Sequence, residues 1–232
     1  MEAVAELSNH ISQFSIFAGT ADKWIWTASA DGRYTTKSAY QIINQVTSES
    51  PTLGVDIKLL NSVWRAKTPQ KTSATAWRLL LNRLPTCDNL LRMKILENED
   101  EATCGECHSR GESANHVFLQ CSKAEMVWNE IQQWMGFYMA RPARIQDFFG
   151  MFSSFQNDKK IKSLLLLTWV CTIWILWKKR NEKRFEKKEW DANSVVLEIK
   201  IRLWSWNKVF RIVGKELDVQ AWCAADLINS LL

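Results

Sequence analysis

Three cysteines and one histidine at short, fixed spacings constrain the fold of this chain more than any other feature. Cys104, Cys107, His116 and Cys121 form the run C-x2-C-x8-H-x4-C. Three thiolates and an imidazole are a donor set of tetrahedral structural zinc sites, and four protein ligands leave no open position for a catalytic water. The alternative is a set of unrelated buried cysteines, but the order and spacing are those of a zinc knuckle. We therefore expect a structural Zn²⁺ here.

The two halves of this motif predict different local backbones. Cys104-Gly105-Glu106-Cys107 is expected to form a tight turn in which the glycine lets the backbone fold around the metal. His116 and Cys121 are separated by about one and a half helical turns, so both side chains are expected to reach one ion. The metal would then lie between a turn and a helix.

Composition and cysteine usage limit the class of protein. Hydrophobic residues make up 47% and charged residues 24% of the 232 residues, which suits a packed core and argues against general disorder. Cys87, Cys171 and Cys223 lie outside the motif without an evident pairing pattern. Residues 1–20 lack the basic start and long apolar stretch of a secretory signal. We expect an intracellular protein, nuclear or cytoplasmic, in a reducing compartment.

The apolar run from Leu164 to Trp177 raises the question of a membrane span. As a helix it is about 21 Å long, whereas the hydrocarbon core of a bilayer is ~30 Å thick. Lysines lie on both sides of the run, so charge sets no orientation. We expect a helix buried on most sides and no membrane span, with membrane insertion as the alternative.

The positive charge of the chain is concentrated in the segment 178–188. The formal net charge is +5, and outside this segment the acidic and basic residues balance. Such a patch would suit contacts with phosphates, binding of an acidic partner or a nuclear import signal; the alternative is the solvated end of a helix. The candidate nucleic-acid-binding residues are Lys178, Lys179, Arg180, Lys183, Arg184, Lys187 and Lys188.

The metal motif has the opposite charge. Between Glu97 and Ser113 there are six acidic residues and one arginine. A knuckle that grips RNA is expected to be basic and to expose aromatic rings, whereas the aromatic residue between these ligands, Phe118, lies beside Val117 and Leu119. This pattern favours a clamp that organises the fold over direct contact with nucleic acid.

Hydrophobic periodicity predicts a mainly helical protein with one small N-terminal β-hairpin. Alternating tryptophans and the turn Asp31-Gly32 predict the hairpin over 23–36. Helices are predicted over about 38–46, 59–64 and 70–82, and a further one is capped by Thr86 and runs through Ile95. An amphipathic helix carrying Trp128 and Trp134 comes after the metal motif.

The second half is expected to form a linker that contains a short helix and then two further helices. Residues 140–158 hold Pro142, Gly150 and phenylalanines that we expect to be exposed. The helix 161–177 leads into the basic segment and a long helix over about 191–213, whose stripe includes Val195, Ile199, Leu203, Trp206, Val209, Phe210 and Val213. Gly214 suits the end of that last helix.

An ordered set of residues runs through most of the chain. Its members are Trp26, Asp31-Gly32, Ser38-Ala39-Tyr40, Val63-Trp64, Pro69, Lys71, Trp77-Arg78, Asn82-Arg83-Leu84-Pro85-Thr86, Asn89-Leu90, the four metal ligands, Glu112-Ser113, Val117-Phe118 and Val127-Trp128, then Trp177 to Glu182, Phe185 and Trp204-Ser205-Trp206. Over about 24–134 this set resembles the zinc-binding domain of plant non-LTR (LINE-type) reverse transcriptases, and the tail also resembles the segment C-terminal to this domain in those polyproteins.

The resemblance implies zinc ligation by the four motif residues and a role in handling RNA and DNA beside a polymerase. The sequence lacks a Tyr-x-Asp-Asp polymerase signature and the carboxylate sets of an endonuclease or ribonuclease H. We therefore expect a stand-alone fragment. Its predicted parts are an N-terminal extension (1–22), the zinc-binding domain (23–138), a linker (139–160) and a C-terminal helical region (161–232).

Two functions compete. The first is a non-catalytic module that binds RNA or DNA non-specifically through the basic segment. The second is a protein-interaction module, with a purely structural zinc site, that uses the apolar helices of 140–155 and 161–177. A zinc enzyme such as a nucleobase deaminase needs a His-x-Glu motif, which His116-Val117-Phe118 does not provide. We expect no small-molecule substrate.

Overall fold

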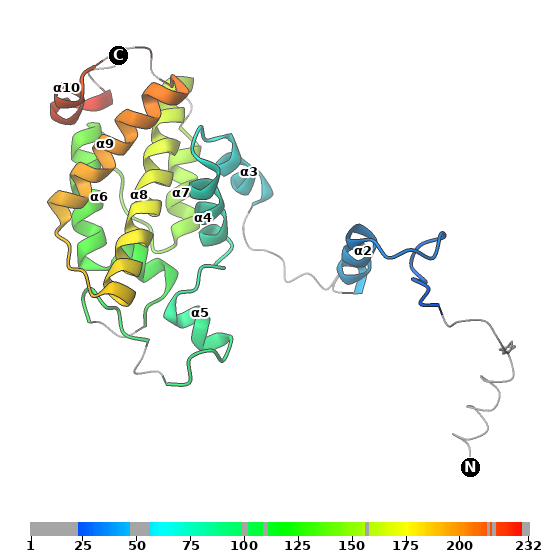
Figure 1. The fold of residues 1–232 in the computed structure, drawn as a ribbon. Coiled ribbons are helices and arrows are strands. Elements are labelled where there is room, and N and C mark those ends of the chain that lie inside the picture. The colour runs from blue at the N-terminus through cyan, green and yellow to red at the C-terminus, as the bar shows by residue number, and fades with distance from the viewer. Residues whose placement is uncertain are drawn as a thin grey trace, which may run out of the picture. The chain divides into compact units, whose positions relative to one another are not determined.

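The computed structural model describes residues 23–46, 56–98, 102–108, 111–155, 158–212, 214 and 217–228. The chain forms two compact units, Met1–Thr52 and Leu53–Leu232. All regular secondary structure of the described residues is helical (Figure 1). The prediction of a mainly helical protein is confirmed, whereas the predicted domain boundaries stay a prediction, and the segment 1–22 lies outside the described residues.

The predicted N-terminal β-hairpin is wrong, because the described part of the first unit contains no strand. The backbone N–H of Trp26 donates to the carbonyl of Gly32 at 2.9 Å, but residues 27–31 fold into successive turns. Polar side chains bind the backbone here, since Ser29 Oγ donates to the carbonyl of Arg33 and the Asp31 carboxylate accepts from the N–H of Arg33. These local bonds occupy groups that a strand ladder would need.

Helix α2 (Thr36–Val46) comes after these turns, as predicted. Thr35 Oγ1 accepts the backbone N–H of Ser38 at 3.1 Å, and Ser38 Oγ accepts Trp26 Nε1–H at 2.9 Å. The helix leaves Tyr40 and Ile43 exposed.

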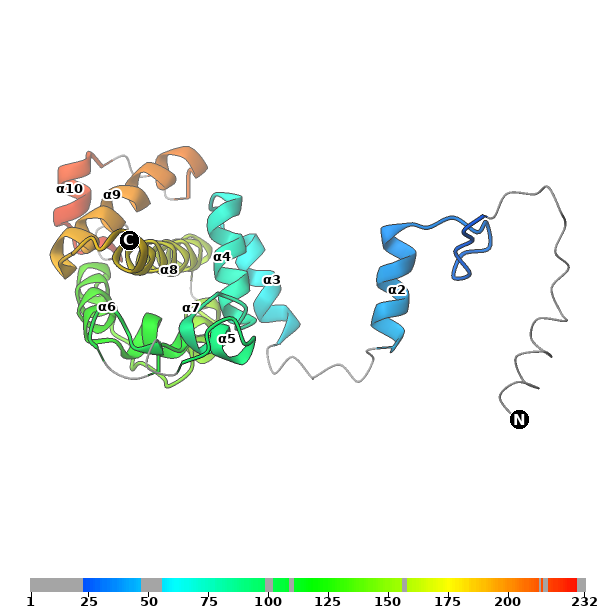
Figure 2. The same cartoon turned by 60° about the horizontal axis from the view of Figure 1, so that its bottom comes forward.

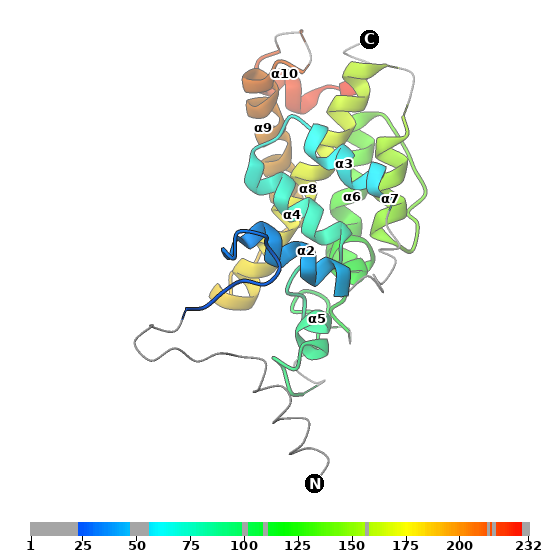
Figure 3. The same cartoon turned by 90° about the vertical axis from the view of Figure 1, so that its right-hand side faces the viewer.

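The second unit is a bundle of helices around one long apolar helix, α8. Its helices are α3 (Ile57–Arg65), α4 (Gln70–Leu80), α5 (Cys87–Arg92), the π-helix η2 (His116–Gln120), α6 (Ser122–Met135), α7 (Ile145–Ser153), α8 (Lys159–Glu186), α9 (Ala192–Phe210) and α10 (Val219–Ala224). Figure 2 looks nearly along α8, with α4, α6, α7 and α9 around it. Figure 3 shows α3 and α4 crossing over α7 and α8.

The apolar run and the basic segment form one continuous helix. α8 is long and apolar enough to cross a membrane by length and composition, but 72% of its apolar window is buried inside the protein. Leu164, Leu167, Trp169 and Ile173 have no exposed surface. The prediction of a helix buried on most sides is confirmed, and the helix carries its last, basic turns out of the core toward the metal motif.

The short helix predicted within 140–158 is confirmed as α7, but the predicted exposure of its phenylalanines is wrong, because they are buried. Phe148, Phe149 and Phe152 lie on α7 with at most 2% of their surface exposed. Phe148 packs edge-on against Trp128, with ring centroids 4.9 Å apart. The spacing i, i+1, i+4 gives one helical face, and a helix of this length needs such packing to be stable.

The end of α9 also differs from the prediction. Val195, Ile199, Leu203 and Trp206 are buried as expected, but Val209 is 70% exposed. Arg211, in the left-handed conformation with φ 47°, ends the helix rather than Gly214. Val213 lies outside the described residues.

Candidate metal centre

The structure brings the four predicted ligands together. Their donor atoms all lie within 4.8 Å of one another, and the group could hold a metal ion. The sulfur atoms of Cys104 and Cys121 are 3.9 Å apart, and Cys107 Sγ is 3.2 Å from His116 Nε2. Ligands at about 2.3 Å (sulfur) and about 2.0 Å (nitrogen) from a tetrahedral Zn²⁺ are separated by roughly 3.5–3.8 Å. The donor set and its spacing therefore fit zinc.

The turn that carries the first two ligands forms differently from the prediction. The backbone N–H of His108 donates to the carbonyl of Cys104 at 2.9 Å and closes the turn. His108 has the positive φ of 57°, whereas Gly105 does not have a positive φ. A side chain at Gly105 would meet Lys183 at an ordinary distance of 3.7 Å. The glycine is therefore not required for the conformation of this turn.

The second pair of ligands lies on a π-helical turn. In an α-helix, residues five apart point to different sides, because 3.6 residues complete one turn. In η2 the N–H of Cys121 donates to the carbonyl of His116 at 2.8 Å, so one wide turn separates the two ligands. Cys121 then leaves the π-helix and becomes the N-cap of α6. This turn explains how ligands five residues apart reach one point.

The two buried sulfur atoms differ in acidity. The Cys104 thiol, and next the backbone N–H groups of Lys123 and Ala124 at the start of α6, lower the pKa of Cys121. Hydrogen bonding to Cys121, and after it burial, raises the pKa of Cys104. Backbone N–H donors near a sulfur stabilise the thiolate, which is the form that binds metal.

Glu106, between the first two ligands, is held by residues from two other parts of the chain. Its carboxylate accepts from Lys123 Nζ at 2.7 Å and from Trp190 Nε1 at 2.7 Å. Lys123 also lies over the ring of Trp190, 4.8 Å from its centroid. These contacts tie the metal turn to the start of α6 and to the connection between α8 and α9.

Glu112, which precedes the third ligand, forms a buried ion pair with Arg180 of α8. The side chains are 2% and 6% exposed, and Arg180 Nε lies 3.1 and 3.2 Å from the two carboxylate oxygens. Arg180 Nη2 donates to the same carboxylate. The backbone N–H of Cys87 adds a bond at 3.1 Å, and the guanidinium lies over Trp177. One carboxylate thus joins the metal loop to α5 and α8.

The acids of the metal motif and the bases of α8 are therefore partners within the protein. The sequence shows both charges but not their pairing, because Glu112 and Arg180 are 68 positions apart. Arg180, predicted to contact phosphates, is buried and paired instead. The supporting residues that the sequence did not identify are Glu106, Glu112, Lys123, Cys87 and Trp190.

Two other predicted contact residues also pair with acids, one of α8 itself and one of α9. Lys178 lies 3.5 Å from carboxylate oxygens of Glu182 and Glu198. Lys179 lies 3.4 and 3.0 Å from the same two acids. Glu198 belongs to α9, so these pairs hold α8 and α9 together.

At the end of α8, Lys183 pairs with Glu189 and Lys188 with Glu186. These pairs are at the surface, since Glu189 is 71% and Glu186 53% exposed. Such pairs contribute little to stability and exchange readily with other ions. Lys188, 64% exposed, therefore stays accessible to a charged partner, whereas the side chain of Lys183 is 19% exposed.

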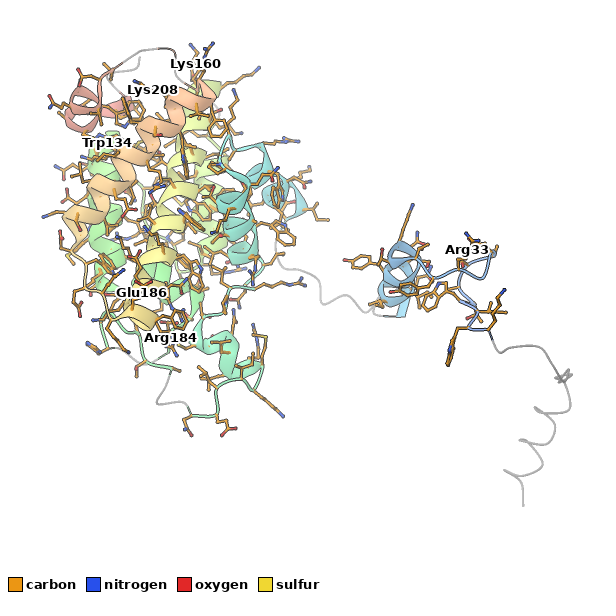
Figure 4. All side chains as sticks on the ribbon, in the orientation of Figure 1. Arg33, Trp134, Lys160, Arg184, Glu186 and Lys208 are labelled. Carbon is orange, nitrogen blue, oxygen red and sulfur yellow. The ribbon has the colours of Figure 1, made fainter. Side chains whose placement is uncertain are left out.

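Arg184 and Lys187 have no carboxylate partner in the part of the chain that the structure describes. Arg184 Nη1 lies 2.8 Å from the sulfur of Cys87. Burial, and after it the Glu112 carboxylate, raises the pKa of Cys87 to about 11, so this thiol is neutral near pH 7. Lys187 is exposed, with φ 57° at the C-cap of α8. Figure 4 labels Arg184 and Glu186 at this end of the helix.

A cavity of about 550 Å³ lies between the metal turn and this end of α8. We call it the metal-turn cavity. It is lined by Thr103, Gly105, Glu106, His108, Glu112, Arg180, Lys183, Arg184, Phe185 and Lys187. Phe185, 73% exposed, forms part of its edge.

A second hollow, of about 630 Å³, lies on the other side of Phe185 between α4 and α8. We call it the α4–α8 groove. The charged residues of its lining are three cations and two acids: Lys71, Arg78, Lys178, Glu182 and Glu186. Lys71 Nζ lies 5.3 Å from the centroid of the Trp174 ring, which also lines the groove. Phe185 thus borders two hollows that both carry cations.

Residues 34–128 match a family model described as zinc-binding in reverse transcriptase. The match begins just before α2, contains all four ligands and ends within α6. No curated protein and no solved structure matches the chain. The match and the Cys/His cluster together fit a zinc-binding domain of the reverse-transcriptase type.

Proposed function

We propose that this protein is a non-catalytic zinc-binding module, derived from a LINE-type reverse transcriptase of plants, that binds single-stranded nucleic acid non-specifically. The observation that carries the proposal is a pair of cations that have no carboxylate partner among the described residues, beside an exposed aromatic ring at the C-terminal end of α8. These cations are Arg184 and Lys187, and Phe185 lies between them in sequence. Phosphates bind such cations and bases stack on such rings.

The zinc in this proposal is structural. Three cysteines and a histidine complete a tetrahedral site and leave no position for a reacting water. Of the acids in the metal loops, Glu106 is engaged by Lys123 and Trp190, and Glu112 by Arg180. Neither carboxylate has the freedom that a general base needs.

The two hollows on either side of Phe185 support binding of a single strand. Proteins that bind single strands combine a positively charged groove with aromatic side chains. The metal-turn cavity contributes Arg184 and Lys187, and the α4–α8 groove contributes Lys71 and Arg78. A strand along this path would cross Phe185 between them.

Salt dependence of binding to a labelled single-stranded oligonucleotide, measured by fluorescence anisotropy, tests the proposal. The double variant Arg184→Gln/Lys187→Gln should reduce the slope of log Kobs against log salt by roughly 1.4, because each lost phosphate contact removes about 0.7. Lys179→Gln/Arg202→Gln changes the net charge equally but removes cations that are paired with Glu198 and line neither hollow, so it should change the slope much less. Salt-independent binding, or equal effects of the two double variants, would contradict the proposal.

A protein-interaction module is the second candidate. The apolar faces of 140–155 and 161–177 no longer favour it, because most of their apolar side chains are buried in the bundle. What favours it is α9, where Leu197 and Ile201 are 50% and 44% exposed and line a shallow hollow. A protein partner that co-purifies after nuclease treatment and a high-salt wash, and is lost in Leu197→Ser/Ile201→Ser, would support this candidate.

A further inference from the structure

We propose that the metal-turn cavity binds the terminal phosphate of a nucleic-acid strand. The inference rests on the proposed function and names the part of the strand that this cavity recognises. Its basis is the charge that the ion pairs of the cavity leave uncompensated.

The cavity has the size of a small-ligand site. Its volume of about 550 Å³ lies within the range of roughly 300–1,000 Å³ that is usual for such sites. Arg180 and Glu112, 6% and 2% exposed, are part of its lining and hold each other in place. A fixed, ion-paired wall of this kind preserves the shape of the cavity when a ligand enters.

The charges that line the cavity do not cancel. Arg180 and Lys183 are balanced by Glu112 and Glu189, respectively. The carboxylate of Glu106 is balanced by Lys123.

Two positive charges remain, on Arg184 and Lys187. The contact of Arg184 is a neutral thiol, and Lys187 has no ion pair with any described residue. The guanidinium of Arg184 is half-buried, so water screens its charge less than that of a fully exposed side chain. The cavity therefore favours an anion, and a doubly charged anion above a singly charged one.

This charge distinguishes the end of a strand from its interior. A phosphomonoester carries a charge of about −1.5 to −2 at pH 7 and presents three acceptor oxygens, whereas an internal phosphodiester carries one negative charge. Arg184 can bind two of those oxygens and Lys187 the third, since arginine forms bidentate contacts with phosphate. A terminal phosphate matches the two cations, and an internal one leaves a positive charge uncompensated.

The position of Phe185 lets the rest of the strand leave the cavity. It borders both the metal-turn cavity and the α4–α8 groove. The base next to the terminal phosphate would stack on this ring, and the phosphates after it would meet Lys71 and Arg78 in the groove.

The test compares three oligonucleotides of one sequence, with a 5′-phosphate, with a 3′-phosphate or with hydroxyl groups at both ends. We expect one phosphorylated form to bind about tenfold more tightly than the hydroxyl form, because hydrogen bonds to charged groups are the strong ones. Arg184→Gln should bring this ratio close to one. Arg78→Gln, the matched substitution in the groove, should weaken all three forms and leave the ratio unchanged. The ratio does not depend on how much of a variant is folded.

Equal affinities for the three oligonucleotides would overturn the inference and leave the proposed function intact, whereas binding of none of them would overturn both. A ratio that survives Arg184→Gln would place the terminal phosphate elsewhere and overturn the assignment to this cavity. A phosphoserine peptide that binds as tightly as the phosphorylated strand would overturn the assignment to nucleic acid.

Discussion

Two successive turns of α8 carry an arginine on the same face, and the two arginines have different environments. Arg180 and Arg184 are four residues apart, and both donate to the sulfur of Cys87, at 3.7 and 2.8 Å. Arg180 is 6% exposed and binds the carboxylate of Glu112, whereas Arg184 is half-buried and has no carboxylate partner among the described residues. The first arginine is therefore part of the fold, and the second is available to a ligand.

The difference arises from the metal loop. The loop presents one buried carboxylate, that of Glu112, to α8, and Arg180, which faces it, forms a structural ion pair. A basic run in a sequence therefore does not identify a binding surface by itself, because each cation acts according to the partner that the fold provides.

Loss of the metal should have the largest effect, because the metal loop contributes to the environments of both Arg180 and Arg184. Structural zinc contributes roughly 10–16 kcal/mol in small zinc domains, so Cys107→Ser or a strong chelator should release zinc and lower the melting temperature sharply. Thermal unfolding measured by circular dichroism, with zinc content determined on the same samples, checks this. Cys223→Ser, outside the motif, is the control. A melting temperature that chelation leaves unchanged would refute the zinc assignment.

Removal of the buried carboxylate of Glu112 should disrupt the environment of Arg180 but not that of Arg184. Glu112→Gln leaves a buried, uncompensated guanidinium, and breaking one partner of such a pair costs roughly 3–5 kcal/mol. Glu189→Gln removes the exposed partner of Lys183 and should cost less than about 1 kcal/mol. Urea unfolding of the two variants measures the difference. Similar small losses in both would show that the Glu112 pair is not structural.

The titration of Cys87, the thiol that both arginines contact, should change the free energy of unfolding by a smaller amount. Burial, and after it Glu112, raises the pKa of this thiol to about 11 from an unfolded value of 9.0. The native state holds the proton longer, so this contribution to stability is complete below pH 9.0 and is lost as pH rises toward 11. For this difference between the two pKa values the full loss should be about 3 kcal/mol.

Urea unfolding at several alkaline pH values, compared between the unchanged protein and Cys87→Ala, isolates this effect, because the lysines titrate in both. The stability of Cys87→Ala should fall less steeply. Parallel curves for the two proteins would show that the thiol keeps an ordinary pKa.

The sequence predicts the local features of this protein well. The periodicity of apolar residues gives most of the helices, and Thr86 caps α5 through the N–H of Asn89 as expected. The spacing of Cys104 to Cys121 identifies all four residues of the metal cluster. These features depend on residues that are close in sequence.

The features that the sequence does not predict depend on distant partners. The contact of Glu112 with Arg180 joins two segments 68 positions apart, and Trp134 Nε1 donates to the carbonyl of Trp222 across 88 positions. The short helix α10, which carries the buried Trp222, has too few residues for a periodic signal. The alternating tryptophans and the turn Asp31-Gly32 predict a β-hairpin over 23–36. Hydrogen bonds from side chains to the backbone favour consecutive turns there instead.

The most direct test measures stability and binding in Arg180→Gln and Arg184→Gln side by side. Arg180→Gln should lose roughly 3–5 kcal/mol of unfolding free energy, because Glu112 stays buried without its partner. Arg184→Gln should keep its stability within about 1 kcal/mol and lose affinity and salt dependence. Equal changes of stability and affinity in the two variants would contradict the account.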